Sequence, residues 1–335
     1  MLVIAPPSSW KCKTYTRLNQ DFIGIKNTSK IITGDEMEKW SELNFLENAK
    51  NYTIFARVRP EQKEKLITAF KRSGFTAMIG DGANDALAIK KADIGMAMFD
   101  GAQATRQLAS VVLVDNSFTA LPGGVRLADN IIQNVEIISG LFFNQVTIGF
   151  FLFVLLAFFN FSYPFTPQNI TLINYFTVGL PSVPVFYWAM SKSKKTHPTS
   201  DLSFLRRVLP YPIWISFLEA VGAACVFALS PQTLKIAESN SLVLLSFVVF
   251  GFIFFALAPR VYGVKMDRDM KVIISLFGLL EIFLLWFVFR TPALTLFFTL
   301  SQPDIKTDLN ALAVILVFGY LQDRFTRSFF FKKED

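Results

Sequence analysis

Long apolar runs in the second half of the chain constrain its fold more than any other feature. Residues 137–325 carry few charges over stretches of about 20 residues, the length that a helix needs to cross the hydrocarbon core of a bilayer. Residues 1–136 instead mix charged and apolar side chains, as a soluble domain does. The chain, 52% hydrophobic over 335 residues, is therefore predicted to have a soluble head and a membrane domain.

The apolar runs predict six membrane-spanning helices. Inside a bilayer every backbone polar group needs an internal partner, and a helix supplies one for each residue of such a run. We therefore expect this half of the chain to form an all-α bundle with the head attached to its first helix. The expected spans are 138–160, 169–190, 208–230, 241–259, 271–289 and 308–323.

Basic residues are concentrated in every second connection of this expected bundle. Lysine and arginine are enriched in cytoplasmic loops, so the alternation predicts that the head and the C-terminus are both cytoplasmic, with the bundle in the cell membrane. These loops account for the net charge of +7, and no nucleic-acid partner is expected. The predicted cytoplasmic side holds Lys192, Lys194, Lys195, Arg206, Arg207, Arg260, Lys265, Arg268, Lys271, Arg324, Arg327, Lys332 and Lys333, whereas the opposite side holds Lys235, Arg290 and Lys306.

Strand-like and helix-like segments alternate along the head. This alternation predicts an α/β sheet, in which ligands bind at the carboxyl ends of the strands. The helix-like segment that follows the first strand has Pro60 in its first turn and Gly74 at its end, which are typical start and stop signals. The strand-like segments are 52–58, 75–82, 93–98 and 110–115, and the helix-like segments are 59–74 and 83–92.

The string GDGAND, which ends the second strand-like segment, is the most informative motif of the head. Gly80 and Gly82 permit a tight turn and a close approach of the backbone to an anionic ligand. Asp81 offers the hard oxygen that Mg²⁺ binds beside phosphate groups. Asn84 and Asp85 are placed to hydrogen-bond the same group or to hold the loop. Taken alone, the alternative for an Asp-Gly pair is an ordinary turn followed by a helix cap.

Lys63 is a second candidate for a phosphate site. It lies in the first turns of the 59–74 helix, shortly before the strand that ends at the GDGAND string. An ammonium group at this place reaches a phosphoryl oxygen if the helix packs beside the turn. Without that neighbour it is a solvated surface lysine, as Lys65 and Lys71 are expected to be.

Three segments together resemble the C-terminal half of the P-type cation-transporting ATPases, most closely the bacterial calcium- and magnesium-type branch. They are FARVRPEQKEKL, AMIGDGANDALAIKKADIGMAM and VLVDNSFTALPGGVRLADNIIQNVEIISGLFFNQ, and the resemblance covers roughly 30–325. It implies a haloacid-dehalogenase-like phosphorylation domain followed by the last six of ten spans. On this basis the chain divides into an unplaced segment, 1–20, the C-terminal part of the phosphorylation domain, 21–122, and the membrane domain, 123–335.

The resemblance also implies roles for the residues of the head. Asp81 matches the Mg²⁺-binding aspartate, Lys63 matches the lysine that contacts the phosphoryl group, and Asn84 and Asp85 match the residues that support the site. The implied cofactors of the complete protein are ATP and Mg²⁺. The implied partners are a transported cation, Ca²⁺ or Mg²⁺, and membrane lipid.

In the membrane domain the resemblance places Asn144, Asn174 and Thr177 on transported-cation positions. Polar side chains inside a span are costly and usually face the bundle interior. For the two asparagines, a role in hydrogen bonding between helices is as well supported as a role in binding the cation. The expected long helix from about Leu121 to Phe158 would carry movement of the head to Asn144.

The sequence departs from the calcium-pump pattern in the membrane. Thr147 and Val178 stand where those pumps carry acidic residues, so the ion is left open between Ca²⁺ and Mg²⁺. Glu219 and Glu281 lie within apolar runs and could supply the missing carboxylates. The alternative for each is a position near the end of a span, in contact with water.

The phosphorylation motif Asp-Lys-Thr-Gly-Thr does not occur in these 335 residues. The string ITGDEM, 32–37, is interpreted as a chance match to a second motif of the family. The predicted function is the C-terminal portion of an ATP-driven P-type cation pump that couples aspartyl-phosphate chemistry to ion transport. The alternatives are a catalytically inactive remnant, a split-pump subunit whose missing half is a separate chain, or a P-type pump for a lipid or a peptide.

Overall fold

The computed structural model describes residues 3–5, 30–41, 45–117, 120–191, 204–229, 236–264, 266–301 and 309–331. The chain forms two compact units, Met1–Pro122 and Gly123–Asp335. Apart from a short strand at Val3–Ala5, the expected unplaced segment 1–20 lies outside the described residues. So do many of the basic residues on which the predicted orientation depends, including Lys192, Lys194 and Lys195.

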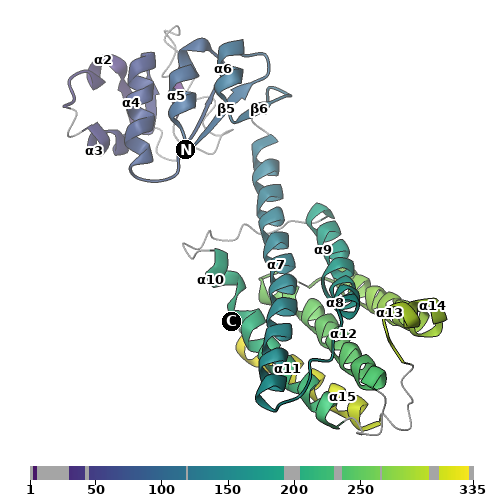
Figure 1. Ribbon diagram of the computed structural model, residues 1–335. Helices are drawn as coiled ribbons and strands as arrows, with labels where there is room; N and C mark the ends of the chain where they lie inside the picture. The colour runs from purple at the N-terminus through teal and green to yellow at the C-terminus, as the bar shows by residue number, and fades with distance from the viewer. Residues whose placement is uncertain are drawn as a thin grey trace. The chain divides into compact units, whose positions relative to one another are not determined.

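The head contains two small parallel sheets of three strands each. Two strands of the second sheet, β5 and β6, are labelled in Figure 1. In both sheets neighbouring strands run in the same direction, so helices cross over between them. The first sheet has the order β1 (Val3–Ala5), β3 (Ile54–Ala56), β2 (Ile31–Thr33), and the second has the order β4 (Ala77–Gly80), β5 (Ile94–Met98), β6 (Val111–Leu113).

Both helices predicted in the head form, and three further short helices of its described residues were not predicted. The expected helix 59–74 forms as α4, which has Pro60 in its first turn and closes with a hydrogen bond from the Gly74 N–H to the Phe70 carbonyl. The expected helix 83–92 is split, because a 3₁₀ turn at Ala83–Asp85 precedes α5. The head helices are α2 (Gly34–Met37), α3 (Phe45–Lys50), α4 (Pro60–Lys71), α5 (Ala86–Lys91) and α6 (Gln103–Leu108).

Local hydrogen bonds explain two polar features of the head. In the ITGDEM string the Thr33 hydroxyl accepts a hydrogen bond from the Glu36 N–H, and the Glu36 carboxylate accepts one from the Thr33 N–H. This capping box starts α2. Before β5 begins, the Asp93 carboxylate accepts hydrogen bonds from the Thr76 N–H and from Lys71, and these two interactions lower the pKa of Asp93. They tie the start of β5 to the start of β4.

The second unit is a bundle of long helices. Five helices of the described residues are long and apolar enough to cross a membrane, which supports a membrane protein. The expected sixth span also forms a helix, α15, but it is not one of these five, since its last turns carry Gln322, Asp323 and Arg324. The five candidate spans are Gly123–Phe158, Pro167–Tyr187, Pro210–Leu229, Ser239–Val261 and Arg268–Arg290.

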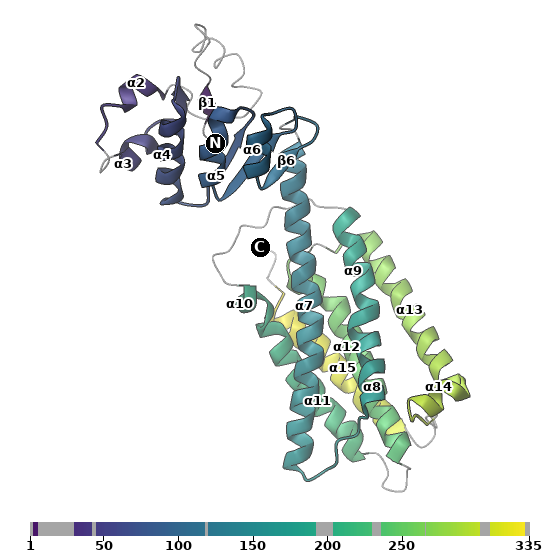
Figure 2. The ribbon, with the colours of Figure 1, turned by 45° about the horizontal axis from the view of Figure 1, so that its top comes forward.

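Figures 1 and 2 show how these helices are arranged within the bundle. In both views α12 lies between α11 and α13, and it is the most buried span, with 72% of its apolar window covered, against 22% to 44% for the other four. The bundle consists of α7 (Ala120–Phe158), α8 (Pro167–Asn174), α9 (Leu180–Ser191), α10 (Phe204–Val208), α11 (Pro210–Leu229), α12 (Ile236–Val261), α13 (Arg268–Arg290), α14 (Pro292–Phe297) and α15 (Leu309–Phe329).

The second candidate span is interrupted by a π-helical turn at Tyr175–Gly179, between α8 and α9. Such turns are rare, shift the hydrogen-bond pattern by one residue and occur frequently at functional sites. This turn includes Thr177 and directly follows Asn174, two residues of the predicted cation site.

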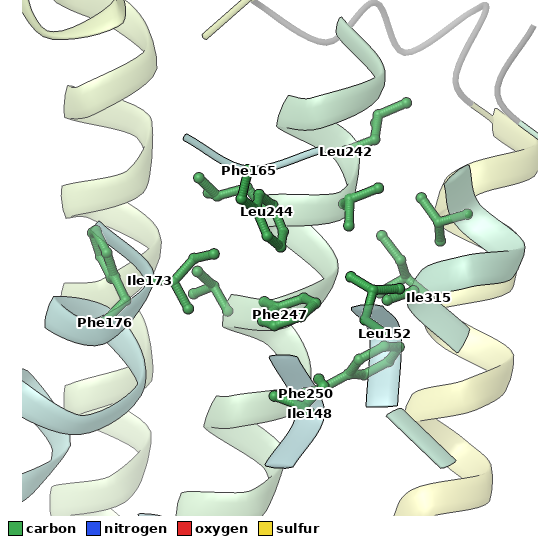
Figure 3. Close-up of a cluster of buried hydrophobic side chains, with 14 of the residues drawn as sticks. Ile148, Leu152, Phe165, Ile173, Phe176, Leu242, Leu244, Phe247, Phe250 and Ile315 are labelled. Atoms are coloured by element: carbon green, nitrogen blue, oxygen red, sulfur yellow. The ribbon is translucent and has the colours of Figure 1, made fainter. Parts of the chain in front are cut away.

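Apolar side chains fill the centre of the bundle (Figure 3). Phe247 and Phe250 of α12 meet Ile148 and Leu152 of α7 in this cluster, together with Ile315 of α15. Close packing of these buried side chains fixes the spacing of three helices. Glu219 of α11 and its polar partners on α7 and α15 form a separate cluster within this bundle.

Candidate functional site

The GDGAND turn lies at the carboxyl end of β4, where ligands bind in parallel sheets. Two hydrogen bonds from the region of α6 hold its backbone. The Ala102 N–H donates to the Asp81 carbonyl at 2.9 Å, and the Thr105 hydroxyl donates to the Gly82 carbonyl at 2.9 Å. Because Thr105 is fully buried, this anchor is shielded from water.

Lys63 and Asp85 form an ion pair beside this turn. The distance between Lys63 Nζ and Asp85 Oδ1 is 2.5 Å, and the two side chains are only 13% and 12% exposed. Lysine and aspartate are seldom this buried unless they are paired. The structure thus brings together two predicted site residues that are 22 positions apart in the sequence.

Asp81 and Asn84, the other two predicted residues of the turn, are exposed. Among the described residues, no group of three or more His, Cys, Asp and Glu side chains would hold a metal ion by itself. One exposed carboxylate at a glycine turn nevertheless suits Mg²⁺, which keeps several waters and takes other oxygens from a phosphate. The donor set of this turn therefore fits Mg²⁺ bound together with a phosphorylated ligand.

The two glycines of the turn differ in the space around them. A Cβ atom added to Gly80 would lie 2.6 Å from Cβ and 2.7 Å from Oδ2 of Asp85. A Cβ atom on Gly82 would have its nearest neighbour, the Asn84 nitrogen, at 3.9 Å. The absence of a side chain at position 80 is therefore what allows Asp85 to reach Lys63.

We expect Gly80→Ala to lower the free energy of unfolding of the head by about 1–3 kcal/mol, as overpacking typically does. Gly82→Ala is the matched comparison and should leave it within about 0.5 kcal/mol of the wild type. Hydrogen exchange of the amides in 60–71 and 77–80 measures both effects. Equal protection in the two variants would show that the contact with Asp85 is not what requires glycine at position 80.

A second polar cluster lies inside the bundle. Asn144 Nδ2 of α7 donates a hydrogen bond to Glu219 Oε2 of α11 at 2.9 Å. Gln322 Nε2 of α15 donates to Glu219 Oε1 at 2.6 Å, and also lies 3.2 Å from the Phe250 carbonyl oxygen of α12. Residues of three helices thus meet at one carboxylate, and a fourth helix contacts Gln322. Asn144, a predicted cation-site residue, is one of its two amide partners.

The other two predicted cation-site residues have different surroundings. Thr177 is buried, and its hydroxyl donates a hydrogen bond to the Ile173 carbonyl at 2.9 Å. Asn174 is exposed. Thr147 stands where the calcium pumps carry an acidic residue. Its hydroxyl donates a hydrogen bond to the Phe143 carbonyl at 2.6 Å, within the same helix.

Two functional candidates were not found from the sequence. Gln322 stands at the polar end of the expected span 308–323, where a glutamine indicates a span end rather than a buried partner. Thr105 lies in a segment for which no element was predicted. No local pattern marks either residue, because each acts through a contact with a distant part of the chain.

The chain is similar to calcium-transporting ATPases of several bacteria. It is 36% identical over 174 residues to the calcium-transporting ATPase CtpE of Mycolicibacterium smegmatis, which covers 49% of this chain and 21% of that protein. It is 29% identical over 239 residues to the calcium-transporting ATPase of Bacillus subtilis, covering 68% of this chain and 26% of that protein. A third relative, the calcium-transporting ATPase lmo0841 of Listeria monocytogenes, is 32% identical over 165 residues.

The chain therefore matches only about a fifth to a quarter of the length of the first two of these relatives. No protein-family model matches it. The similarity to the calcium-transporting ATPases nevertheless extends over about half of the chain or more. The similarity therefore supports a partial P-type cation-transporting ATPase.

Proposed function

We propose that the chain is the C-terminal portion of an ATP-driven pump that couples the formation of an aspartyl phosphate to the transport of calcium. The observation that carries this proposal is the buried Lys63–Asp85 pair next to the exposed Asp81, at the carboxyl end of a parallel strand. A carboxylate for a metal ion and an ammonium for a phosphoryl oxygen are two of the groups that phosphoryl transfer uses.

Each residue of the turn has a role in this proposal. Asp81 would hold Mg²⁺, which when bound supplies positive charge to the phosphoryl oxygens. Lys63 adds a second positive charge, and Asp85 positions its ammonium through the 2.5 Å contact. Asn84 is exposed beside Asp81 and is placed to donate a hydrogen bond to a phosphate oxygen. Residues 21–122 would then form the C-terminal part of a haloacid-dehalogenase-like phosphorylation domain.

The membrane domain, 123–335, would contain six spans in the cell membrane, with α15 as the sixth, and both ends of this chain would be cytoplasmic. One continuous helix, α7, runs over 39 residues from Ala120 to Phe158, or about 58 Å at 1.5 Å per residue. It includes Asn144, so a movement of its first turns would reach the polar cluster in the bundle directly.

The nucleophile is the missing component, because the Asp-Lys-Thr-Gly-Thr motif does not occur in this sequence. We therefore expect the purified chain to show no vanadate-sensitive, Mg²⁺-dependent ATP hydrolysis, since no aspartyl phosphate forms without that aspartate. Together with the polypeptide that carries the motif, whether joined to it or separate, the chain should support hydrolysis that calcium stimulates. The hydrolysis assay contradicts the proposal if the chain alone hydrolyses ATP in this way, or if the assembled protein does not.

A further inference from the structure

We propose that Glu219, Asn144 and Gln322 form a calcium-binding site inside the bundle. This inference rests on the proposed cation transport and assigns the carboxylate of the site to α11. The two positions at which acidic residues were expected, 147 and 178, hold Thr147 and Val178 and supply none.

The first argument is the convergence of α7, α11 and α15 on one carboxylate, with α12 in contact with Gln322. Both oxygens of Glu219 are engaged by amide groups, one from α7 at 2.9 Å and one from α15 at 2.6 Å. Glu219 is 1% exposed, Asn144 is 4% exposed and Gln322 is 0% exposed, so the cluster is closed to water. Residues as far apart in the sequence as 144 and 322 therefore present polar atoms to one buried point.

The second argument is that oxygen atoms of both amides have no partner. Within the described part of the chain, Asn144 Oδ1 and Gln322 Oε1 are buried and accept no hydrogen bond. A buried polar atom in this state costs free energy unless something binds it. In the arrangement that the structure shows, the NH₂ groups of these amides face the carboxylate, so a cation at Glu219 meets the two free oxygens only after both amides rotate.

Rotation of the two amide groups converts the cluster into a set of oxygen ligands. A half-turn of an amide exchanges its NH₂ and its oxygen with little change of shape. Both amide oxygens would then face the place that their NH₂ groups occupy now, next to the carboxylate and the Phe250 carbonyl. This makes five oxygens available: two from Glu219, one from each amide and one from the main chain.

The composition of this set favours calcium over magnesium. Ca²⁺ accepts carboxylate, amide and backbone oxygens in irregular arrangements of six to eight, whereas Mg²⁺ demands a nearly regular octahedron and retains several waters. The oxygens counted here are carboxylate, amide and backbone oxygens, the mixture that Ca²⁺ accepts. With one carboxylate, the site should bind calcium weakly, because affinity rises with the number of charged ligands.

The charge balance points in the same direction. Among the described residues, no lysine or arginine forms an ion pair with Glu219, so an ionised carboxylate would be buried without a counter-charge. Burial of an unpaired charge is strongly unfavourable, and a bound cation removes that cost. Ile148 and Phe250, which lie next to the cluster along α7 and α12, belong to the apolar core (Figure 3), where electrostatic attraction is strong.

Close helix packing holds the site in shape. One turn from Glu219, a Cβ atom added to Gly222 would lie 2.8 Å from the ring of Phe318, which is one turn from Gln322. This close approach of α11 and α15 is what allows a glutamine to reach the carboxylate across the interface. The ligand geometry therefore depends on these helices and on α7, all of which this chain contains.

Glu281 provides a matched control within the same bundle. It is also buried, at 3% exposed, and its Oε1 atom has no hydrogen-bond partner among the described residues. No hydrogen bond of the described residues joins it to an asparagine or glutamine side chain. If any buried carboxylate sufficed, Glu281 would serve as well as Glu219.

The test is equilibrium binding of radioactive calcium to the purified full chain in detergent micelles. We expect saturable binding that Glu219→Gln weakens by about tenfold or more and that Glu281→Gln leaves unchanged. Gln322→Met, which keeps the size of the side chain and the carboxylate but removes the amide oxygen, should weaken binding as well. A single monodisperse peak in gel filtration establishes that each variant is folded.

Three results would overturn the inference: no saturable calcium binding by the wild-type chain, equal binding by the wild type and Glu219→Gln, or equal losses in Glu219→Gln and Glu281→Gln. Binding that excess magnesium displaces as readily as unlabelled calcium does would also contradict the choice of ion. The assay uses no ATP, so its outcome is independent of whether the assembled protein hydrolyses ATP. A failure of the site and a failure of the proposed pump function are therefore distinguishable.

Discussion

Replacing Lys63 with methionine should stop ATP turnover by the assembled protein and loosen the head at the same time. Methionine fills much of the same space but leaves the carboxylate of Asp85, which is 12% exposed, without its ammonium partner. Removing one member of a buried pair costs about 3–5 kcal/mol. On the proposed function this ammonium would face the phosphoryl group, and its loss should lower the rate by about a hundredfold to a thousandfold.

The double variant Lys63→Met with Asp85→Asn separates the two effects. Because neutral side chains of similar volume often replace a buried pair without loss, the double variant should regain most of the lost stability. It should remain inactive, since it still lacks the ammonium. Hydrogen exchange of α4 and β4 measures the first effect and ATP hydrolysis the second. Recovery of activity in the double variant would mean that Lys63 acts only as a partner of Asp85.

Asp81→Asn should cause a comparable loss of activity with no loss of stability. The side chain is exposed, so a substitution of the same size should change the free energy of unfolding by less than about 0.5 kcal/mol. The amide binds Mg²⁺ much less well than a carboxylate, and we expect Mg²⁺-dependent hydrolysis by the assembled protein to fall by at least about a hundredfold.

The matched control is Asp35→Asn, a substitution of the same chemistry at another exposed position of the head, in α2. It should leave both stability and hydrolysis unchanged. Hydrolysis by Asp81→Asn near the wild-type rate would show that another group holds the metal ion. A large loss of exchange protection in the same variant would show instead that Asp81 has a structural role.

Local signals account for the parts of the fold that the sequence predicted. Pro60 and Gly74 bracket α4, and the alternation of strands and helices around the GDGAND string depends on neighbouring residues alone. The apolar runs predicted their helices for the same reason, because hydropathy is a property of a continuous segment. In α15 that signal is weak, since its last turns are polar, and the sixth span stays a prediction.

The parts that were missed depend on tertiary contacts. Glu219 and Gln322 are separated by 103 positions, and nothing in either segment indicates which face of α11 meets which face of α15. The anchor from Thr105 to the GDGAND turn is of the same kind. The π-helical turn after Asn174 changes which residues of that span face inward, so the helical spacing of the sequence alone does not place Asn174.

The most direct test of the central claim is ATP-driven uptake of radioactive calcium by inverted membrane vesicles. The vesicles contain this chain together with the polypeptide that carries the Asp-Lys-Thr-Gly-Thr motif, with Asp81→Asn vesicles as the inactive control. We predict vanadate-sensitive accumulation of calcium that requires both Mg²⁺ and ATP and is lost in the control. ATP hydrolysis by the wild-type vesicles without movement of calcium would contradict the account.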